Sequence, residues 1–331
     1  HYFNALGQPQ KKQFIALERG YHGTSSIGAG LTGLPAFHTN FDVPHSNQHH
    51  IPSPYPYRHE SGDDPAALIA SSVQSLRDKV AELGSENVAA FFCEPVQGSG
   101  GVIVPPCGWL KAISEACTDL GILLVADEVI TAFGRTGPLF ASAAEDVEPD
   151  IITVAKGLTA GYAPMGAMLF SSEIYDTIAD SDRNGAVVGH GSTYSAHPVS
   201  AAIGLEVLRL YEEGGLLANG DKISPLFEQG LQDLRQHPLV GDARQRGLLG
   251  ALELVANKTT KSRFDVSLKL SDRIQKKAYQ NGIIFRTFAD NILGFAPALC
   301  YSESEMELLF ERLRKTLDDV LSDSDVRANV A

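Results

Sequence analysis

The sequence has 331 residues, the length of about two ordinary domains. Its 44% hydrophobic and 20% charged residues indicate a globular chain with a large core and exclude a disordered tail. The 27 Lys+Arg and 40 Asp+Glu residues give a formal charge of -13, which argues against a nucleic-acid partner. No segment approaches the roughly 20 apolar residues that cross a bilayer, so no membrane partner is expected.

The cysteines are too few for a disulfide scaffold, and they show neither a CxxC pair nor the spacing of a metal site. They are Cys93, Cys107, Cys117 and Cys300. This usage is typical of a reducing compartment and predicts a cytoplasmic protein.

The first residues read as the end of a helix followed by a strand over 12–18. The sequence begins at His1 rather than at an initiator Met. Because natural proteins rarely begin inside an element, we expect a segment to be missing before residue 1.

Strands and helices alternate, which predicts an α/β fold with a mostly parallel sheet. Continuous apolar runs predict buried strands at 88–93, 122–126 and 151–154. A helix is predicted at 108–120, with Gly121 as its stop. The strand at 166–170 follows too closely for a parallel crossover, so we expect it to run antiparallel.

The second part of the chain has a different texture. After a long helix at 197–213, amphipathic helices surround short strands, as in a smaller α+β domain. The helices are predicted at 220–236, 267–281 and 303–321, and the strands at 247–255, 283–286 and 291–295. We therefore predict a large domain at 1–211 and a small domain at 212–331.

Residues 34–64 are rich in Pro, His, Tyr and Asn and lack periodicity, so a long loop is expected, and such loops are often functional. Four histidines lie in its later part, His45, His49, His50 and His59. Zinc sites need defined ligand spacing and usually Cys or carboxylate support. The histidines are therefore predicted to bind no metal.

Two predicted strands end in ionisable residues, and ligands gather at the carboxyl ends of such strands. Asp127 follows one buried run and Lys156 follows the next. A lysine at the carboxyl end of an apolar strand is a candidate nucleophile for a Schiff base. Pyridoxal-phosphate chemistry also needs an acid that keeps the pyridine nitrogen protonated. Taken alone, the two residues are equally compatible with an ordinary loop lysine and a helix-capping aspartate.

Five short motifs then decide between these interpretations. They are Gly20-Tyr-His-Gly23, Glu94-Pro-Val-Gln-Gly98, Ala126-Asp-Glu-Val129 with Phe133-Gly-Arg-Thr-Gly137, Thr153-Val-Ala-Lys-Gly-Leu158 and His190-Gly-Ser-Thr-Tyr-Ser-Ala-His-Pro198. Each motif alone is a weak indication, but their ordered series resembles the class III (ω-) aminotransferases. The resemblance extends from about residue 1 to 320. The resemblance implies fold type I, with helices flanking a mostly parallel sheet, and pyridoxal 5'-phosphate as cofactor.

The resemblance also implies roles around the cofactor. Lys156 matches the lysine that forms the Schiff base, and Asp127 matches the aspartate that keeps the pyridine nitrogen protonated. Val129 corresponds to the residue on one face of the ring and Tyr21 to the aromatic side chain stacked on the other. Gln97 lies in the loop beside the cofactor and is assigned to the region of the ring hydroxyl.

Ser192 and Thr193 match the segment that contacts the cofactor phosphate of a neighbouring subunit. The resemblance therefore implies a homodimer with shared active sites, or a tetramer that contains it. His22 is included among the cofactor-binding residues, and with His197 it is predicted to pack or hydrogen-bond rather than act as a general base. Lys156 can move the protons itself.

Arg286, in the segment Gly282-Ile-Ile-Phe-Arg-Thr287, matches the family's mobile arginine, which grips a substrate carboxylate. The alternative is a surface arginine at the end of a strand. In the ornithine and 4-aminobutyrate branches, the position of Ser99 is typically a glutamate that engages this arginine. Serine here frees Arg286 for a keto acid, which favours pyruvate as acceptor and an amine, polyamine or ω-amino acid as donor.

One family feature is absent from the sequence. The Gly- and Ser-rich turn that holds the cofactor phosphate would precede residue 1, so we expect the chain alone to bind the cofactor poorly. Three alternatives stay open: another reaction on the same cofactor (racemase, decarboxylase, aminomutase or phospho-lyase), a non-catalytic truncated relative, and a nicotinamide-binding module. The last is disfavoured because no strand is followed by GxGxxG.

Overall fold

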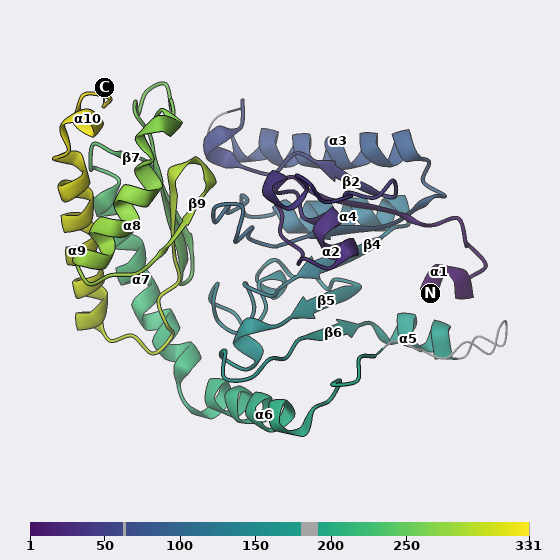
Figure 1. Ribbon diagram of the computed structural model, residues 1–331. Coiled ribbons are helices and arrows are strands. Elements are labelled where there is room, and N and C mark those ends of the chain that lie inside the picture. The colour runs from purple at the N-terminus through teal and green to yellow at the C-terminus, as the bar shows by residue number, and fades with distance from the viewer. Residues whose placement is uncertain (62–63, 180–190, 331) are drawn as a thin grey trace. The chain divides into compact units, whose positions relative to one another are not determined.

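A computed structural model describes residues 1–61, 64–179 and 191–330 (Figure 1). The chain divides into two compact units. The first unit comprises His1–Gly98, Pro105–Phe133 and Phe140–Gly214. The second begins again at Gly215 and also takes two short segments from the first half of the chain, Ser99–Val104 and Gly134–Leu139. Ser99–Val104 begins directly after the Glu94–Gly98 motif, and Gly134–Leu139 begins inside the Phe133–Gly137 motif.

The first unit is built on a sheet with the strand order β2-β1-β3-β4-β5-β6. Its strands are β1 (Gln13–Leu17), β2 (Gln48–Ile51), β3 (Val88–Cys93), β4 (Leu123–Asp127), β5 (Ile151–Val154) and β6 (Ala167–Phe170). The pairs from β2 to β5 are parallel, and β6 is antiparallel to β5, which confirms the prediction from the short connection. The carboxyl ends of five strands therefore lie along one edge.

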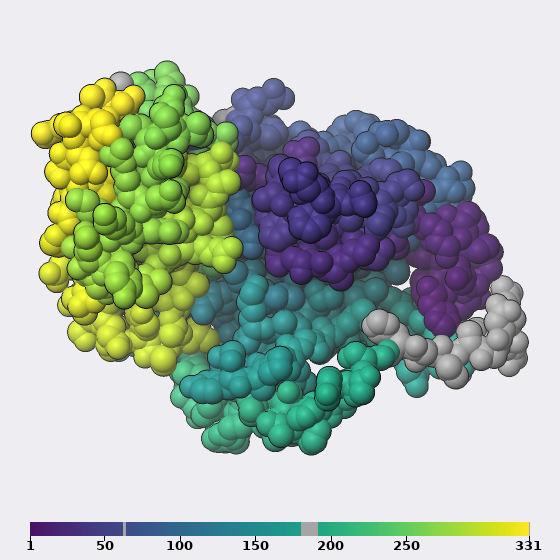
Figure 2. Space-filling model, viewed as in Figure 1, coloured from purple at the N-terminus to yellow at the C-terminus, as the bar shows by residue number. Residues whose placement is uncertain are grey.

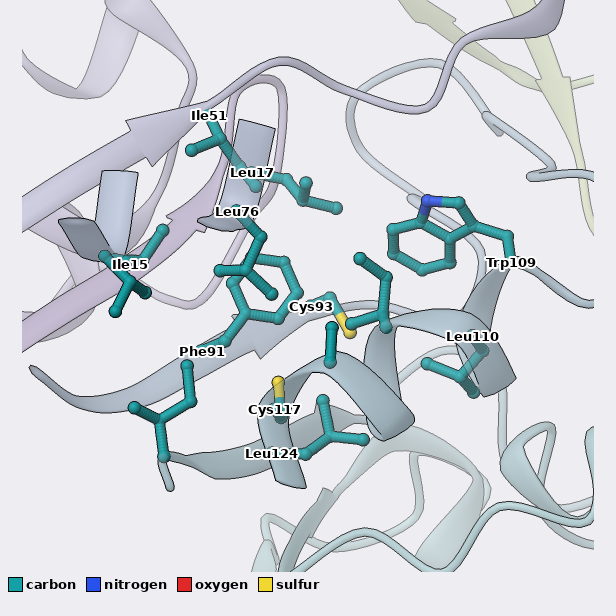
Figure 3. Packing of buried hydrophobic residues seen from close by; sticks show 14 of the residues in the cluster. Ile15, Leu17, Ile51, Leu76, Phe91, Cys93, Trp109, Leu110, Cys117 and Leu124 are labelled. Atoms are coloured by element: carbon teal, nitrogen blue, oxygen red, sulfur yellow. The ribbon is translucent and has the colours of Figure 1, made fainter. Parts of the chain in front are cut away.

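Two helices cover one face of this sheet, α3 (Pro65–Leu83) and α4 (Trp109–Leu120). The carboxylate of Asp64 caps α3 by accepting from the amides of Ala66 and Ala67. Gly121, at φ +62°, ends α4 in the left-handed conformation that glycine tolerates. Figure 3 shows the resulting core, in which Trp109 lies beside the buried side chains of α4 and of strands β1 and β3.

The expectation of a structureless loop over 34–64 is wrong, because β2 lies within it. Gln48 pairs beside Phe14 and Ile51 beside Leu17 at the edge of the sheet. Gln48 and Ile51 are buried, with two partly exposed histidines between them. This spacing is neither an apolar run nor an alternation, so the pattern did not reveal a strand. Two short 3₁₀ turns, Pro35–Phe37 and Pro56–Arg58, flank it.

The second unit has an antiparallel sheet with the order β7-β8-β10-β9. Its strands are β7 (Val240–Arg246), β8 (Leu249–Leu254), β9 (Arg286–Phe288) and β10 (Ile292–Phe295), and its helices are α7 (Leu216–Leu234), α8 (Leu270–Gln280), α9 (Glu303–Leu321) and α10 (Ser324–Arg327). Strand β7 was not predicted, because charged residues interrupt it. The strand predicted at 283–286 is wrong: the Ile283 amide closes the end of α8 on Ala278, and β9 begins only at Arg286.

The remaining helices belong to the first unit: α1 (Tyr2–Ala5), α2 (Ser26–Leu31), α5 (Ser172–Ala179) and α6 (Pro198–Glu213). Helix α1 followed by β1 confirms the predicted helix-to-strand start of the sequence. Within the described ranges, no helix has both the length and the apolar character needed to cross a membrane.

Candidate active site

The motif residues converge because each follows the carboxyl end of a neighbouring strand. Tyr21 and His22 come after β1, Glu94 after β3, Asp127 at the end of β4 and Lys156 after β5. The register places Cys93 beside Ala126, and Asp127 beside Thr153, three residues before Lys156. This common edge is where open α/β sheets bind their ligands.

Asp127 is anchored by two hydrogen bonds. Its Oδ2 lies 2.9 Å from Nδ1 of His22, and its Oδ1 accepts from the Val129 amide at 3.1 Å. Burial alone would lower the pKa of His22, but the hydrogen bond to Asp127 and the charges of Asp127 and Glu94 raise it above its ordinary value. His22 is therefore a hydrogen-bonding partner of Asp127, as the sequence predicted.

Lys156 lies in a strained turn. Its φ is +33°, a left-handed value that is rare for a residue other than glycine, and strain of this kind clusters at functional sites. The Tyr211 hydroxyl donates to the Gly157 carbonyl at 2.8 Å, and the Phe133 ring stacks on Tyr211 with a centroid distance of 5.7 Å. The Lys156 side chain is exposed, and among the described residues its ammonium has no hydrogen-bond or ion-pair partner.

The Tyr21–His22 loop is held from beneath by a buried residue that sequence reasoning missed. Thr32 is fully buried; its hydroxyl accepts from the His22 amide at 2.8 Å and donates to the Gly23 carbonyl at 3.1 Å. The Tyr21 ring is half-buried and meets the edge of Phe37 at 5.3 Å. One face of the loop is therefore fixed by the 34–61 segment.

Glu94 opens one of the motifs, but the sequence predicted no role for it. Its carboxylate is buried and accepts from the Tyr21 amide at 2.9 Å and from the Gly98 amide at 2.8 Å. Burial raises the pKa of Glu94 to about 7, with the charge of Asp127 acting in the same direction and His22 opposing it. The available signal was a carboxylate placed directly after a continuous apolar strand.

Gln97 lies at the same edge but is already used within the fold. It is fully buried; its Nε2 donates to the Glu18 carbonyl at 2.9 Å, and its Oε1 accepts from the Ser53 hydroxyl. The structure therefore shows Gln97 joining the ends of β1 and β2 to the 94–98 turn.

Val129 and Glu128 follow Asp127 and have different surroundings. Val129 is partly exposed at the edge of the sheet. Glu128 is fully buried, and its two oxygens accept four hydrogen bonds from Thr131, Ala141 and Ser142 at 2.7–2.8 Å. Glu128 therefore organises the loop after β4.

Ser192 and Thr193 lie before α6 and are exposed. With Tyr162 and Tyr194 they belong to a surface on which large side chains are open to solvent, 83% for Tyr162 and 79% for Tyr194. His190, the first residue of the last motif, lies outside the described residues. Among residues 1–61, 64–179 and 191–330, Ser192 and Thr193 are open to solvent.

Arg286 belongs to the second unit, where it opens β9 instead of ending a strand. Its side chain is exposed, and its guanidinium lies 5.7 Å from the centroid of the Phe288 ring. Ser99, on a segment that also belongs to the second unit, is partly buried.

His45, His49, His50 and His59, the histidines considered as metal ligands, each have a partner inside the fold. His45 meets the Ser26 hydroxyl, His49 the Gln13 side chain, His50 the Leu31 carbonyl and His59 the Ser61 hydroxyl. Across the described part of the chain, no group of three or more His, Cys, Asp or Glu residues is arranged to hold a metal ion.

Comparison with known proteins gives one consistent answer. Residues 1–317 match the family described as class-III aminotransferases. The chain is 37% identical over 320 residues to gamma aminobutyrate transaminase 3 of Solanum lycopersicum, which covers 96% of this chain and 61% of that protein. It is 41% identical over 321 residues to putrescine–pyruvate aminotransferase of Pseudomonas aeruginosa, covering 96% and 69%.

Solved structures agree. An (S)-enantioselective omega-transaminase from Thermomicrobium roseum matches with a TM-score of 0.92 and 38% identity, over 97% of this chain and 71% of that one. A PLP-bound amine transaminase from an uncultivated Pseudomonas species matches with a TM-score of 0.92 and 36% identity, over 96% and 72%. The chain thus spans less than two thirds of the tomato relative and about seven tenths of these structures.

Proposed function

The chain belongs to the class-III aminotransferases, whose cofactor is pyridoxal 5'-phosphate, and on that premise we propose that it carries the catalytic edge of a transaminase. The reaction moves an amino group from an amine, polyamine or ω-amino acid to a keto acid. The observation that carries the proposal is the placement of Asp127 and Lys156 at the ends of neighbouring parallel strands, one buried and hydrogen-bonded, the other strained and exposed.

The residues present fit the cofactor. A buried carboxylate, supported by His22 from behind, suits a protonated ring nitrogen, because a charge-assisted hydrogen bond is strong where water is excluded. Tyr21 and Val129, both partly exposed at this edge, suit the two faces of an aromatic ring. An exposed lysine without an ion-pair partner among the described residues suits a carbonyl.

Pyridoxal phosphate supplies an electron sink that lets a substrate Cα–H bond ionise. Asp127 would hold the sink in its electron-accepting state, and His22 would orient Asp127. Lys156 would bind the cofactor and, once displaced by the amine, would take a proton at Nζ from the substrate carbon and return it to another carbon. The 156–161 turn, held by Tyr211 and Phe133, would keep that ammonium in place.

Arg286 would select the acceptor. A guanidinium grips a carboxylate with two parallel hydrogen bonds, and Ser99 offers no competing charge. This supports pyruvate as the acceptor and an amine, polyamine or ω-amino acid as the donor. Among the relatives, one is named for gamma aminobutyrate and another for putrescine and pyruvate, which is the same chemical range.

A second copy of the chain would complete the site. A groove of about 780 Å³ beside α6 includes Ser192, Tyr162 and Tyr194 in its lining. Val199 and Leu205 on α6 are 59% and 70% exposed, an apolar surface that a partner subunit would bury. In Figure 2 the teal-green residues of the α6 region lie at the surface of the molecule. In such a homodimer, Ser192 and Thr193 would reach the cofactor phosphate of the partner.

The test is an absorbance spectrum of the protein with pyridoxal phosphate. Amine donors added without keto acid should bleach the cofactor band, and pyruvate should restore it. Lys156→Ala should abolish the change, and Asp127→Asn should slow it at least about a hundredfold while leaving the circular dichroism unchanged. A Lys156→Ala variant with normal turnover would refute the proposal. Turnover that needs no keto acid would assign the protein to another reaction of this cofactor.

A further inference from the structure

The interior of the candidate site contains a buried carboxylate that the proposed reaction does not use. Glu94 is 5% exposed, and each of its two oxygens accepts one backbone amide, from Tyr21 and from Gly98. These amides belong to two different motifs. One carboxylate therefore fixes the loop that presents the Tyr21 ring and the turn that follows β3.

The 94–98 turn also touches the turn after Asp127. A Cβ atom on Gly98 would lie 2.9 Å from Cδ1 of Ile130, so a larger residue at position 98 would displace the Ile130 side chain. Ile130 follows Val129, the residue assigned to the other face of the cofactor ring. The 94–98 turn, which Glu94 holds, thus contacts both segments assigned to the ring: the Tyr21–His22 loop on one face, and the turn from Asp127 to Ile130 that carries the other face and the nitrogen end.

Charge links Glu94 to the same centre. Cys93 pairs beside Ala126 in parallel strands, so the residues that follow them, Glu94 and Asp127, are neighbours at the edge. The charge of Glu94 raises the pKa of His22, and His22 Nδ1 lies against Asp127. His22 Nε2 is buried without a hydrogen-bond partner among the described residues, so the ring is held through Nδ1 and by charge.

We propose that Glu94 is a positioning residue of the cofactor site: its carboxylate fixes the Tyr21 and Gly98 backbones, and its charge acts on the His22 ring that is hydrogen-bonded to Asp127. The inference rests on the proposed function, because it takes Asp127 to face the cofactor ring nitrogen. Glu94 touches neither cofactor nor substrate in this account.

The other titratable groups nearby do not replace Glu94 in this role. His50, from β2, faces His22, and burial lowers the pKa of His50. Cys93 directly precedes Glu94, and burial raises its pKa well above the ordinary value. The Glu128 carboxylate is turned to Ala141 and Ser142, which take up both of its oxygens. Glu94, His22 and Asp127 are therefore the groups whose charges interact with one another at this edge.

Three variants separate charge from architecture. Glu94→Gln keeps the size but removes the charge, Glu94→Asp keeps the charge but shortens the reach, and Glu115→Gln makes the same change on the exposed face of α4. The measured quantity is the pKa of the His22 ring, obtained from a pH titration of ¹⁵N-labelled histidine by nuclear magnetic resonance without cofactor. The His22 resonances are identified by their loss in His22→Gln. Dissociation of pyridoxal phosphate is measured beside it.

We expect Glu94→Gln to lower the pKa of His22 and to weaken cofactor retention about tenfold, the loss of about one hydrogen bond to a charged group. Glu94→Asp should keep the His22 titration but weaken retention, and Glu115→Gln should change neither. A Glu94→Gln variant with an unchanged His22 titration would overturn the proposal, because a purely structural carboxylate would leave that titration in place.

A second measurement needs no variant and so does not depend on folding of the mutants. In the unmodified protein, ¹³C-labelled glutamate should show one carboxyl group that titrates near pH 7. A His22 ring whose resonances do not change over the pH range in which the Glu94 carboxyl titrates would overturn the inference, because a charge that acts on the ring must be seen by it. Both resonance measurements are made without cofactor. Failure of the protein to bind pyridoxal phosphate would therefore refute the proposed function, while the His22 titration would still show whether Glu94 acts on His22.

Discussion

Glu128→Gln is expected to destabilise the first unit by about 3 kcal/mol, and the arrangement of donors explains why. Oε2 accepts from the Thr131 hydroxyl and the Ala141 amide, and Oε1 accepts from the hydroxyl and the amide of Ser142. Whichever way the new amide turns, its NH₂ group meets one hydroxyl, which can rotate to accept, and one backbone N–H, which cannot. One buried donor is therefore stranded, at a cost of about 1–3 kcal/mol, and the remaining bonds lose their charge assistance.

Urea unfolding followed by circular dichroism measures this cost, with Glu115→Gln on the exposed face of α4 as the matched control. Glu128→Ala should cost more, about 4–5 kcal/mol, because it strands all four donors and leaves a cavity. The control should lie within about 0.5 kcal/mol of the parent protein. A Glu128→Gln variant as stable as the control would show that the network does not organise the loop after β4.

Three further predictions follow. Gly157→Ala places a Cβ atom 2.9 Å from the Phe133 ring, so it should cost about 1–3 kcal/mol in urea unfolding and lower kcat by shifting Lys156. The pKa of Glu94 rises on folding from 4.5 to about 7, so the folded state binds a proton more tightly than the unfolded state does. The free energy of unfolding should therefore fall by up to about 3 kcal/mol between pH 5 and pH 8 when it is compared with that of Glu94→Gln. Equal pH profiles of the two proteins would contradict this. Ser302→Ala removes the capping box with Glu305 at the start of α9 and should cost about 1 kcal/mol, whereas a neutral result would show that packing alone starts that helix.

The parts of the fold that the sequence predicted are those with strong one-dimensional signals. The apolar runs at 88–93 and 151–154 predicted strands, and the structure has β3 and β5 there; β3 is buried at nearly every position, as expected of a central parallel strand, whereas β5 is only partly buried. Strand β2 carries no such signal, since its pairing with β1 at the edge needs only two buried positions. Edge strands of this kind are fixed by tertiary contacts, which no local pattern contains.

The same distinction holds at the site. The sequence placed Asp127 and Lys156 at the edge of the sheet because each comes at or just after the end of a predicted buried strand; their catalytic roles stay predictions. Glu94 follows one too, yet its role depends on the Tyr21 amide, which is 73 residues away in the sequence. Gln97 also makes contacts with distant segments, since Glu18 and Ser53 each engage one atom of its amide. One N–H and one acceptor site of that amide remain, and its assignment to the cofactor stays a prediction.

The central claim is that Lys156 is the residue that binds pyridoxal phosphate covalently, and borohydride reduction followed by peptide mapping tests it most directly. Reduction fixes the cofactor to its lysine, and trypsin then cannot cleave there. Lys156 is the only lysine or arginine between Arg135 and Arg183, so the account predicts that the label appears in an uncleaved peptide over residues 136–183. A label on any other lysine, or no label on a protein that binds the cofactor, would contradict it.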